Sequence, residues 1–309
     1  MAKGFSTQSA MVLLEQPVDL DALMACLAPL RQLQRDEHSE PGWMSKPSVL
    51  VPMRPEVNGH VLVDLVDEPW PDGMGDPKED VDLFGAWSMG FFGPWVFPGN
   101  LQRAQAMSFT WREAREVSSR HRAFVRIRSS YILGASEDAP LLPEDYEPLD
   151  ELEFVTEVAL HVLQLPGALA YFNPNGEVLR TPKGVTDELA WCEQRNLLPL
   201  PLWANVRLFQ LGDGLCVMDT IGMEQLDTTD HEAVFRPSEY DPGEVDGFLR
   251  SISLYVFQNG PVIETGNTAD GPGGVRWEAQ LMETSLAPQP RPVLRWVPQD
   301  GSRPPLDEP

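Results

Sequence analysis

The sequence lacks the long apolar runs that membrane-spanning and secreted proteins need. No stretch approaches the ~20 consecutive apolar residues of a transmembrane helix. Near the N-terminus the apolar run from Ala10 to Leu14 ends at Glu15. That run is too short for the core of a signal peptide, and no small-residue cleavage site follows it. We therefore expect a cytoplasmic protein with no membrane partner.

Cysteine is scarce, and the three cysteines that occur, Cys26, Cys192 and Cys216, are widely spaced and form no C-x-x-C motif. An odd number of distant cysteines excludes a disulfide framework. Because each has apolar neighbours, buried free thiols are the favoured interpretation, and a reactive thiol is the alternative.

Motifs for catalysis, cofactor binding and metal binding are missing. The five histidines form no H-E-x-x-H pattern, and the chain has neither a phosphate-binding P-loop nor a G-x-S-x-G nucleophile elbow. The glycine-rich segment 266–274 precedes no helix, so it suits a mobile hairpin loop better than a phosphate cradle. We expect no catalytic residues, no cofactor and no metal, and hence a protein that is not an enzyme.

Acidic residues are in large excess. Forty-seven acids against 23 bases give a formal net charge of −24. Such a charge repels nucleic acid and anionic membranes and attracts cationic partners, although solubility alone is a simpler explanation. The acids concentrate in residues 64–82 and 219–232, and we expect both segments to be solvated loops. Within the second, His231 between two acids could act as a general base, but adjacent side chains point to different faces.

Two further clusters stand out. Residues 84–99 pack six aromatics among glycines and prolines, which favours an irregular core layer, with an exposed contact surface as the alternative. Seven arginines between residues 103 and 128 form a basic island that either pairs with acidic loops or binds an anionic ligand. The residues predicted to contact a partner are Asp67, Glu68, Asp72, Asp76, Trp87, Phe91, Trp95, Asp219, Glu224, Asp227 and Asp230.

Hydrophobic periodicity predicts a mixture of short strands and helices. Strands are expected at residues 9–14, 49–53, 60–66, 121–132, 168–172, 205–209, 215–219, 275–282 and 293–297. Helices are expected from Asp19 to near Pro29, after Asn100, at 148–163, from Thr186 to about Arg195, and at 242–258, where Asp241 is the cap and Glu244 completes a capping box.

This order predicts an α+β protein with mostly antiparallel sheets and helices packed on one face, because hairpins are frequent and strict βαβ alternation is absent. It permits two sheet-plus-helix halves. The Pro- and acid-rich segment 135–148 is the clearest linker. We therefore divide the chain into residues 1–140, residues 141–299 and a flexible tail at 300–309.

Two stretches together resemble a known family. Residues 92–111 (FGPWVFPGNLQRAQAMSFTW) have an F-G-P-x-x-x-P-G-x-L-x-R-A pattern, and residues 230–271 join a capped helix ending LYVFQNG to a strand and a Gly266-Asn267-Thr268 turn. The C-terminal stretch is similar to the bacterial family known as domain of unknown function 4261. The resemblance implies a standalone bacterial cytosolic protein, in some cases associated with toxin–immunity or secretion genes, and it provides no catalytic residues.

Together these observations favour a non-enzymatic cytoplasmic binding protein, most concretely an immunity-type inhibitor that occludes a basic toxin or effector domain. Two alternatives remain. One is a small-ligand-binding protein or enzyme whose site is built from distant residues such as Asp219, His231 and the arginines. The other is an adaptor of a secretion system.

Overall fold

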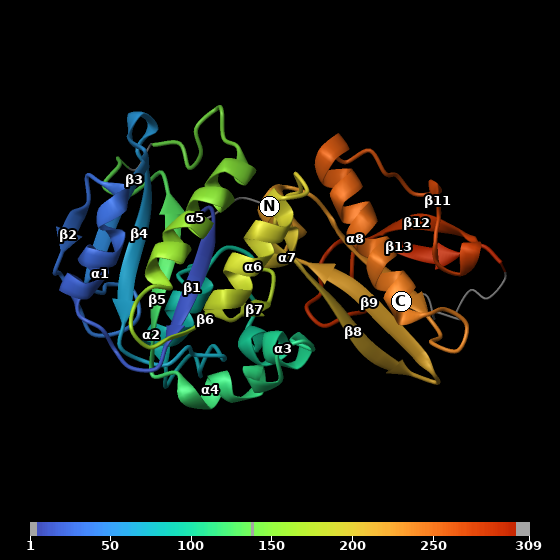
Figure 1. The fold of residues 1–309 in the computed structure, drawn as a ribbon, viewed down its shortest axis with the longest axis horizontal. Helices are drawn as coiled ribbons and strands as arrows, with labels where there is room; N and C mark the ends of the chain where they lie inside the picture. Colours follow the sequence, from blue (N-terminus) through green and yellow to red (C-terminus); the bar gives the residue numbers. More distant parts are fainter. Residues whose placement is uncertain (1–4, 137–138, 301–309) are drawn as a thin grey trace. The chain divides into compact units, whose positions relative to one another are not determined.

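The computed structural model describes residues 5–136 and 139–300 (Figure 1). By its internal contacts the chain divides into two units, Met1–Trp203 and Ala204–Pro309. Each unit contains one β-sheet with its own helices and core. Apart from Asp300, the expected tail at 300–309 lies outside the described residues.

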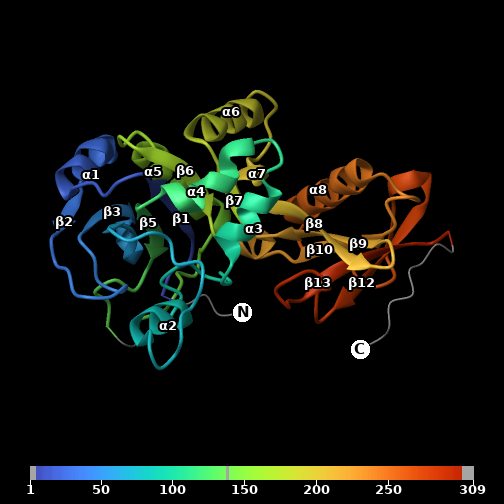
Figure 2. The ribbon, with the colours of Figure 1, turned by 90° about the horizontal axis from the view of Figure 1, so that it is seen from below.

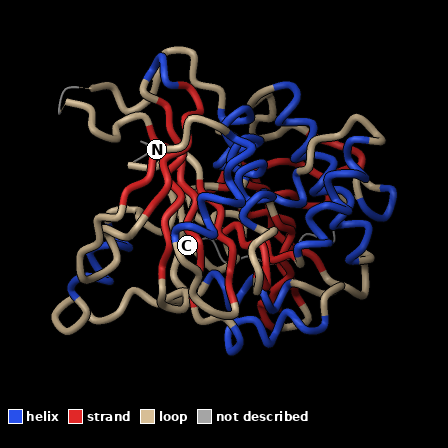
Figure 3. Tube along the Cα trace, turned by 60° about the vertical axis from the view of Figure 1, so that its left-hand side comes forward, coloured by secondary structure: helices blue, strands red, loops and turns tan. Residues whose placement is uncertain are grey.

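The first unit contains most of the helices. Its strands are β1 (Ser9–Leu14), β2 (Gln34–Asp36), β3 (Ser48–Arg54), β4 (Gly59–Val66), β5 (Ala123–Ser130), β6 (Ala168–Asn173) and β7 (Val178–Arg180). Its helices are α1 (Leu20–Leu27), α2 (Val81–Ser88), α3 (Asn100–Met107), α4 (Val117–Arg120), α5 (Pro148–Val162), α6 (Pro182–Glu193) and α7 (Leu200–Trp203). Long loops, tan in Figure 3, separate many of these elements, as the thirty prolines predict.

The first sheet has the order β2-β3-β4-β5-β1-β6-β7, and each neighbouring pair is antiparallel. Figure 2 shows α1, α5 and α6 along one side of this sheet and α2 on the other. Both faces of the central strands are therefore covered, which explains why β1 and β5 are buried at every position.

Strand β5 shows how the sequence assigns residues to faces. Ala123, Val125 and Ile127 point to one face, and Arg126 and Arg128 point to the other, as the period of two predicts. Both arginine side chains are almost wholly buried, so this face combines a charged cluster with an apolar core.

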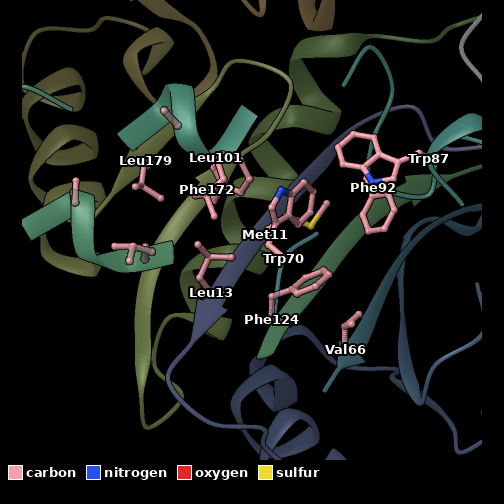
Figure 4. Close-up of a cluster of buried hydrophobic side chains, with 14 of the residues drawn as sticks. Met11, Leu13, Val66, Trp70, Trp87, Phe92, Leu101, Phe124, Phe172 and Leu179 are labelled. Atoms are coloured by element: carbon pink, nitrogen blue, oxygen red, sulfur yellow. The ribbon is translucent and has the colours of Figure 1, made fainter. Parts of the chain in front are cut away.

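That apolar core is aromatic (Figure 4). The Trp70 ring lies 5.2–5.3 Å, centroid to centroid, from Phe92, Phe124 and Phe172, each in an edge-on arrangement. Such T-shaped pairs stabilise a core beyond the area they bury. The preferred interpretation of residues 84–99 as an irregular core layer thus holds for Phe92 and Trp87, which are buried here.

The second unit is built around a six-stranded sheet of order β11-β12-β13-β10-β9-β8. Its strands are β8 (Asn205–Gly212), β9 (Leu215–Ile221), β10 (Asp230–Phe235), β11 (Thr268–Asp270), β12 (Arg276–Met282) and β13 (Val293–Pro298). The pair β10–β13 is parallel, and the other described pairs are antiparallel. Helix α8 (Pro242–Asn259) packs against one face. The predicted α+β class with mostly antiparallel sheets is confirmed.

Helix caps agree in part with the predictions. Asp19 and Asp241 accept hydrogen bonds from backbone N–H groups at the starts of α1 and α8, as expected. Thr181, rather than Thr186, caps α6 by accepting from the Gly184 N–H at 2.9 Å, and the helix begins at Pro182. The sequence T-P-K-G fits this start because proline suits the first helical turn.

The sequence also predicted that Asn100 caps the helix that follows it and that Glu244 completes a capping box, and the structure differs on both points. Asn100 is buried within α3 and accepts a hydrogen bond from Trp70 Nε1 at 3.1 Å. The start of α3 is instead capped by Asp72, which accepts from the backbone N–H groups of Leu101 and Gln102. Glu244 does not complete a capping box. Its Oε2 accepts from the Gly273 N–H at 3.0 Å.

The segment 135–148, expected to join two halves, lies inside the first unit. Strand β6 follows it in the sequence and pairs directly with β1, so residues on both sides of the segment share one sheet. The division between units falls after Trp203 instead, where α7 ends and β8 begins the second sheet. Pairing of distant strands, which local composition does not reveal, explains the difference.

Candidate functional site

An acidic hollow of about 560 Å³ lies on the first unit. The start of α1, the segment from β2 to β3, and the end of β4 form its walls. Its lining residues are Val18, Asp19, Leu20, Arg35, Glu37, Ser39, Glu40, Pro41, Lys46, Pro47, Leu65 and Asp67. Four carboxylates and two cationic side chains are among them, so the lining carries a negative charge over an apolar floor.

Lys46 explains how Asp67 and Glu68 are positioned. Its side chain is only 8% exposed, and its Nζ lies 3.4 Å from Asp67 Oδ1 and 3.6 Å from Glu68 Oε1. The two carboxylates are 73% and 48% exposed, so they are oriented by one buried cation while facing solvent. Exposed carboxylates held in this way are available to a second cation.

Arg35 orients the carboxylates on the opposite wall. It forms ion pairs with Asp21 and, at 2.8 Å, with Glu37. Asp21 and Glu37 are 79% and 73% exposed. The hollow and its rim therefore present solvated carboxylates that sequence reasoning identified only on the side of Asp67 and Glu68.

The remaining acids of residues 64–82 have separate roles. Asp64 is buried within β4 and pairs with Arg126 and Arg128, so it is not part of a solvated loop. Asp72 is half-buried. Burial raises its pKa, although the hydrogen bonds that it accepts from backbone N–H groups act in the opposite direction. Asp76 is exposed and caps the following turn through the N–H groups of Lys78 and Glu79.

The segment from Asp219 to Glu232 is not the expected solvated connection. Asp219 lies within β9, and Asp230 is the first residue of β10. Both side chains are almost fully buried. Asp219 is paired with Arg207 at 2.5 Å and with Arg291 at 2.7 Å, and Asp230 is paired with Arg291 at 2.8 Å. Two of the four acids predicted to contact a partner in this segment, Asp219 and Asp230, are thus held in internal ion pairs.

A third acid extends this buried network. Arg295 donates to Glu232 Oε1 at 2.6 Å, and the Leu286 N–H donates to Glu232 Oε2 at 3.0 Å. Burial raises the pKa of Glu232, and the charge and hydrogen bond of Arg295 oppose that shift. Burial lowers the pKa of Arg291, but attraction to Asp230 and Asp219 outweighs this, and the pKa is raised overall.

The network fastens the loop of residues 283–292 over one face of the second sheet. Arg207 Nη1 donates to Gln289 Oε1 at 2.7 Å, and its Nη2 donates to the Pro288 carbonyl at 3.3 Å. Three arginines and three acids balance in charge, so the intact network leaves no uncompensated buried charge, and removing one partner would destabilise the fold. Sequence reasoning missed it, although apolar strand residues directly before Asp219 and after Glu232 were a usable signal.

The other candidate residues of this segment, Glu224, Asp227 and His231, differ in how far their side chains are exposed. Asp227 is exposed in the turn after η4 (Met223–Leu226), and Glu224 is half-buried. His231 is fully buried, and its Nδ1 accepts a hydrogen bond from Trp296 Nε1 at 3.3 Å. Burial lowers the pKa of His231 to about 4. His231 lies on the opposite face of β10 from its neighbours Asp230 and Glu232, so these acids do not orient it.

The aromatic candidates divide between core and surface. Trp87 is 7% exposed and packs on Trp70 and Phe92. Phe91 and Trp95 are half-buried, and the Phe91 ring stacks on Phe5 with centroids 5.6 Å apart. Trp87 and Trp95 line a shallow hollow of about 300 Å³, which we call the aromatic hollow.

The arginine island pairs largely within the protein. Arg103 bonds Glu177 at 2.7 Å, and Arg120 lies 3.4 Å from Glu15. No ion pair joins Arg112 or Arg115 to another described residue. These two arginines line a separate hollow of about 770 Å³, together with acidic and aromatic side chains.

The structure also bears on thiol reactivity, metal binding and membrane spans within the described residues. Cys26, Cys192 and Cys216 are free, and burial raises the pKa of Cys26 and Cys192 to about 11, so these thiols are poorly reactive. In residues 5–136 and 139–300, no three His, Cys, Asp or Glu side chains are grouped to hold a metal ion. None of the described helices combines the length and apolar character of a membrane span.

Comparison with known protein families identifies a stretch of the second unit. Residues 219–297 match the family model described as "Domain of unknown function (DUF4261)". This range contains the end of β9, then β10, α8, β11, β12 and most of β13. It includes every residue of the buried ion-pair network except Arg207, and residues 92–111 lie outside it. No curated protein and no solved structure matches the chain. The similarity to the DUF4261 family is thus shown for residues 219–297, which lie in the second unit.

Proposed function

We propose that this is a non-enzymatic cytoplasmic binding protein that takes up a cationic segment of a protein partner in the acidic hollow. The most concrete form of this function is an immunity-type inhibitor that covers the working surface of a basic toxin or effector domain. The supporting observation is the hollow, where carboxylates on two walls are held by Lys46 and Arg35 but remain exposed.

The chemistry of the hollow suits a lysine or arginine side chain better than a free metal ion. The carboxylates are spread around an apolar floor that includes Leu20 and Leu65, which can contact the aliphatic stem of such a side chain. The net charge of −24 adds a long-range attraction that raises the association rate with a basic partner.

A double charge reversal tests this function. Glu37→Lys with Glu40→Lys changes two exposed acids of the hollow, and Glu153→Lys with Glu157→Lys on the exposed side of α5 is the matched control. Wild-type protein, immobilised at low salt, is expected to retain a basic protein from its bacterium. The control should retain it as well, and the hollow variant should not.

The inhibitor form requires a second measurement. Expression of the captured protein should stop cell growth, and co-expression of wild-type protein or the α5 control should restore it, whereas the hollow variant should not. Equal capture by all three proteins would overturn the assignment of the hollow. Capture without toxicity would favour an adaptor of a larger assembly, and failure to capture any protein would favour a small-ligand protein.

A further inference from the structure

A second site, selective for the opposite charge, is indicated by two buried arginines. Asp64 accepts hydrogen bonds from Nε and Nη2 of Arg126, but its contact with Arg128 is a single one of 3.4 Å. Arg128 is 1% exposed, and its Nε and Nη1 atoms have no hydrogen-bond partner among the described residues. One carboxylate thus serves two guanidinium groups.

This imbalance is costly to the folded protein. A buried charge without a counter-charge is strongly destabilising, and buried N–H groups normally have acceptors. Burial, followed by repulsion from Arg126, lowers the pKa of Arg128 to about 9, even though Asp64 attracts its charge. Arg128 is therefore suited to meet an additional anionic group.

The aromatic hollow lies next to this arginine pair. The Phe91 ring covers the Arg128 guanidinium, with 5.0 Å between the ring centroid and Cζ, and Phe5 stacks on Phe91. Phe5 also lines the hollow. In addition, a Cβ on Gly93 in the hollow would come within 2.3 Å of Ser9 Oγ, and Ser9 faces Arg128 across the β1–β5 pair.

The lining of the hollow suggests the class of ligand. Phe5, Pro94, Val96 and Phe97 provide an apolar lining. Ser6 Oγ and Trp87 Nε1 belong to lining residues, are buried, and have no partner among the described residues. Both of them, like the two Arg128 atoms, can donate a hydrogen bond, so the complementary ligand combines an apolar body with acceptor oxygens.

From this geometry we propose that the aromatic hollow binds a small apolar carboxylate, whose body lies among the aromatic side chains and whose carboxylate accepts hydrogen bonds from Arg128. Phe5 and Phe91 move aside together when the ligand enters, because the Phe91 ring covers the guanidinium and Phe5 stacks on that ring. A volume of about 300 Å³ accommodates a ligand with one six-membered ring. This site is independent of the acidic hollow and of its cationic partner.

Titration calorimetry with phenylacetate tests the site. Phenylacetamide, which has the same shape without the charge, and inorganic phosphate, which has charge without the apolar body, serve as comparison ligands. We expect the amide to bind about ten- to a hundred-fold more weakly than phenylacetate, because it loses a charge-assisted hydrogen bond. Phosphate alone should bind more weakly than phenylacetate.

Two variants locate the binding. Arg128→Met is expected to abolish the preference for phenylacetate over phenylacetamide. Val96→Trp fills the hollow without touching the arginine pair and is expected to abolish binding of both ring compounds, so the test does not depend on the folding of the arginine variant. Equal affinity for acid and amide, unchanged binding by Val96→Trp, or no binding of phenylacetate would each overturn the proposal and leave buried water as the partner of Arg128.

Discussion

Asp64 lies between Arg126 and Arg128 on one face of the first sheet and is paired far more closely with the first of them than with the second. It is the carboxylate that both guanidinium groups share. Removing its charge would leave two buried cations side by side, so this residue is expected to dominate the electrostatic stability of the first unit.

We predict that Asp64→Asn lowers the free energy of unfolding by about 3–5 kcal/mol, because breaking a buried ion pair leaves an uncompensated charge. Urea denaturation followed by far-UV circular dichroism measures this loss. Asp67→Asn, three residues farther along and 73% exposed, is the control and should change stability by less than about 0.5 kcal/mol. Similar small effects of both changes would show that the buried pair contributes little.

The pH dependence of the second unit should report on His231. The folded-state pKa is about 4, below the ordinary value of about 6.5, so below pH 6.5 the unfolded chain binds a proton that the folded chain does not. Stability contributed by the neutral side chain is therefore present above pH 6.5 and is lost as the pH falls toward 4. Between pH 7 and pH 5 the loss from this residue should be about 2 kcal/mol.

His231→Gln provides the comparison for that measurement. The variant has no group that titrates at this position, so its stability should fall less steeply than that of the wild type between pH 7 and pH 5. Denaturant titrations at both pH values give the two slopes. Parallel slopes for the two proteins would contradict a buried neutral histidine, whatever the absolute stability of the variant.

Arg291 should control the order of the loop at 283–292. Arg291→Met removes the cation shared by Asp219 and Asp230, and we expect faster amide hydrogen exchange in this loop together with a loss of about 3 kcal/mol or more. Arg250→Met is the matched control, because its pair with Asp246 is exposed on α8. Its effect should stay within about 0.5 kcal/mol, and unchanged exchange in the Arg291 variant would contradict the fastening role.

Two glycines of the aromatic segment distinguish close packing from backbone strain. Gly90 and Gly93 both have positive φ angles, +74° and +122°, but a Cβ on Gly93 would come within 2.3 Å of Ser9 Oγ, whereas on Gly90 its nearest neighbour would be 3.8 Å away. Gly93→Ala should therefore cost about 3 kcal/mol and Gly90→Ala about 1 kcal/mol. Thermal unfolding of the two variants measures this difference, and equal effects would show that only the backbone conformation matters.

Local pattern was sufficient to place most elements of the fold. The alternation along β5 and the apolar stripe of α8 have periods that only one secondary structure satisfies, and the Gly212–Gly214 turn marks the β8–β9 hairpin. The division between the units was not predictable in this way. It depends on β6 pairing with β1, more than 150 residues earlier, and no local composition records such a pairing.

The candidate sites were less predictable for a physical reason. Charge counts cannot tell an exposed carboxylate from a buried one, and residues 219–232 are acidic because Arg207, Arg291 and Arg295 meet them from other strands and loops. Asp67 and Glu68 were correctly predicted to be solvent-exposed because these two acids do lie at the surface. Their neighbours Glu37 and Glu40 were missed because the hollow forms only when the segment from β2 to β3 folds against the start of α1.

The place of β13 in its sheet has a consequence for biosynthesis. This strand, the last one along the described chain, lies between β12 and β10 rather than at an edge. Before a ribosome has synthesised residues 293–298, β12 and β10 lack the strand that forms hydrogen bonds with both of them. The second sheet should therefore be completed only after residues 293–298 have been synthesised, and nonsense mutations shortly before Val293 should yield a chain that proteases degrade from its unpaired strands.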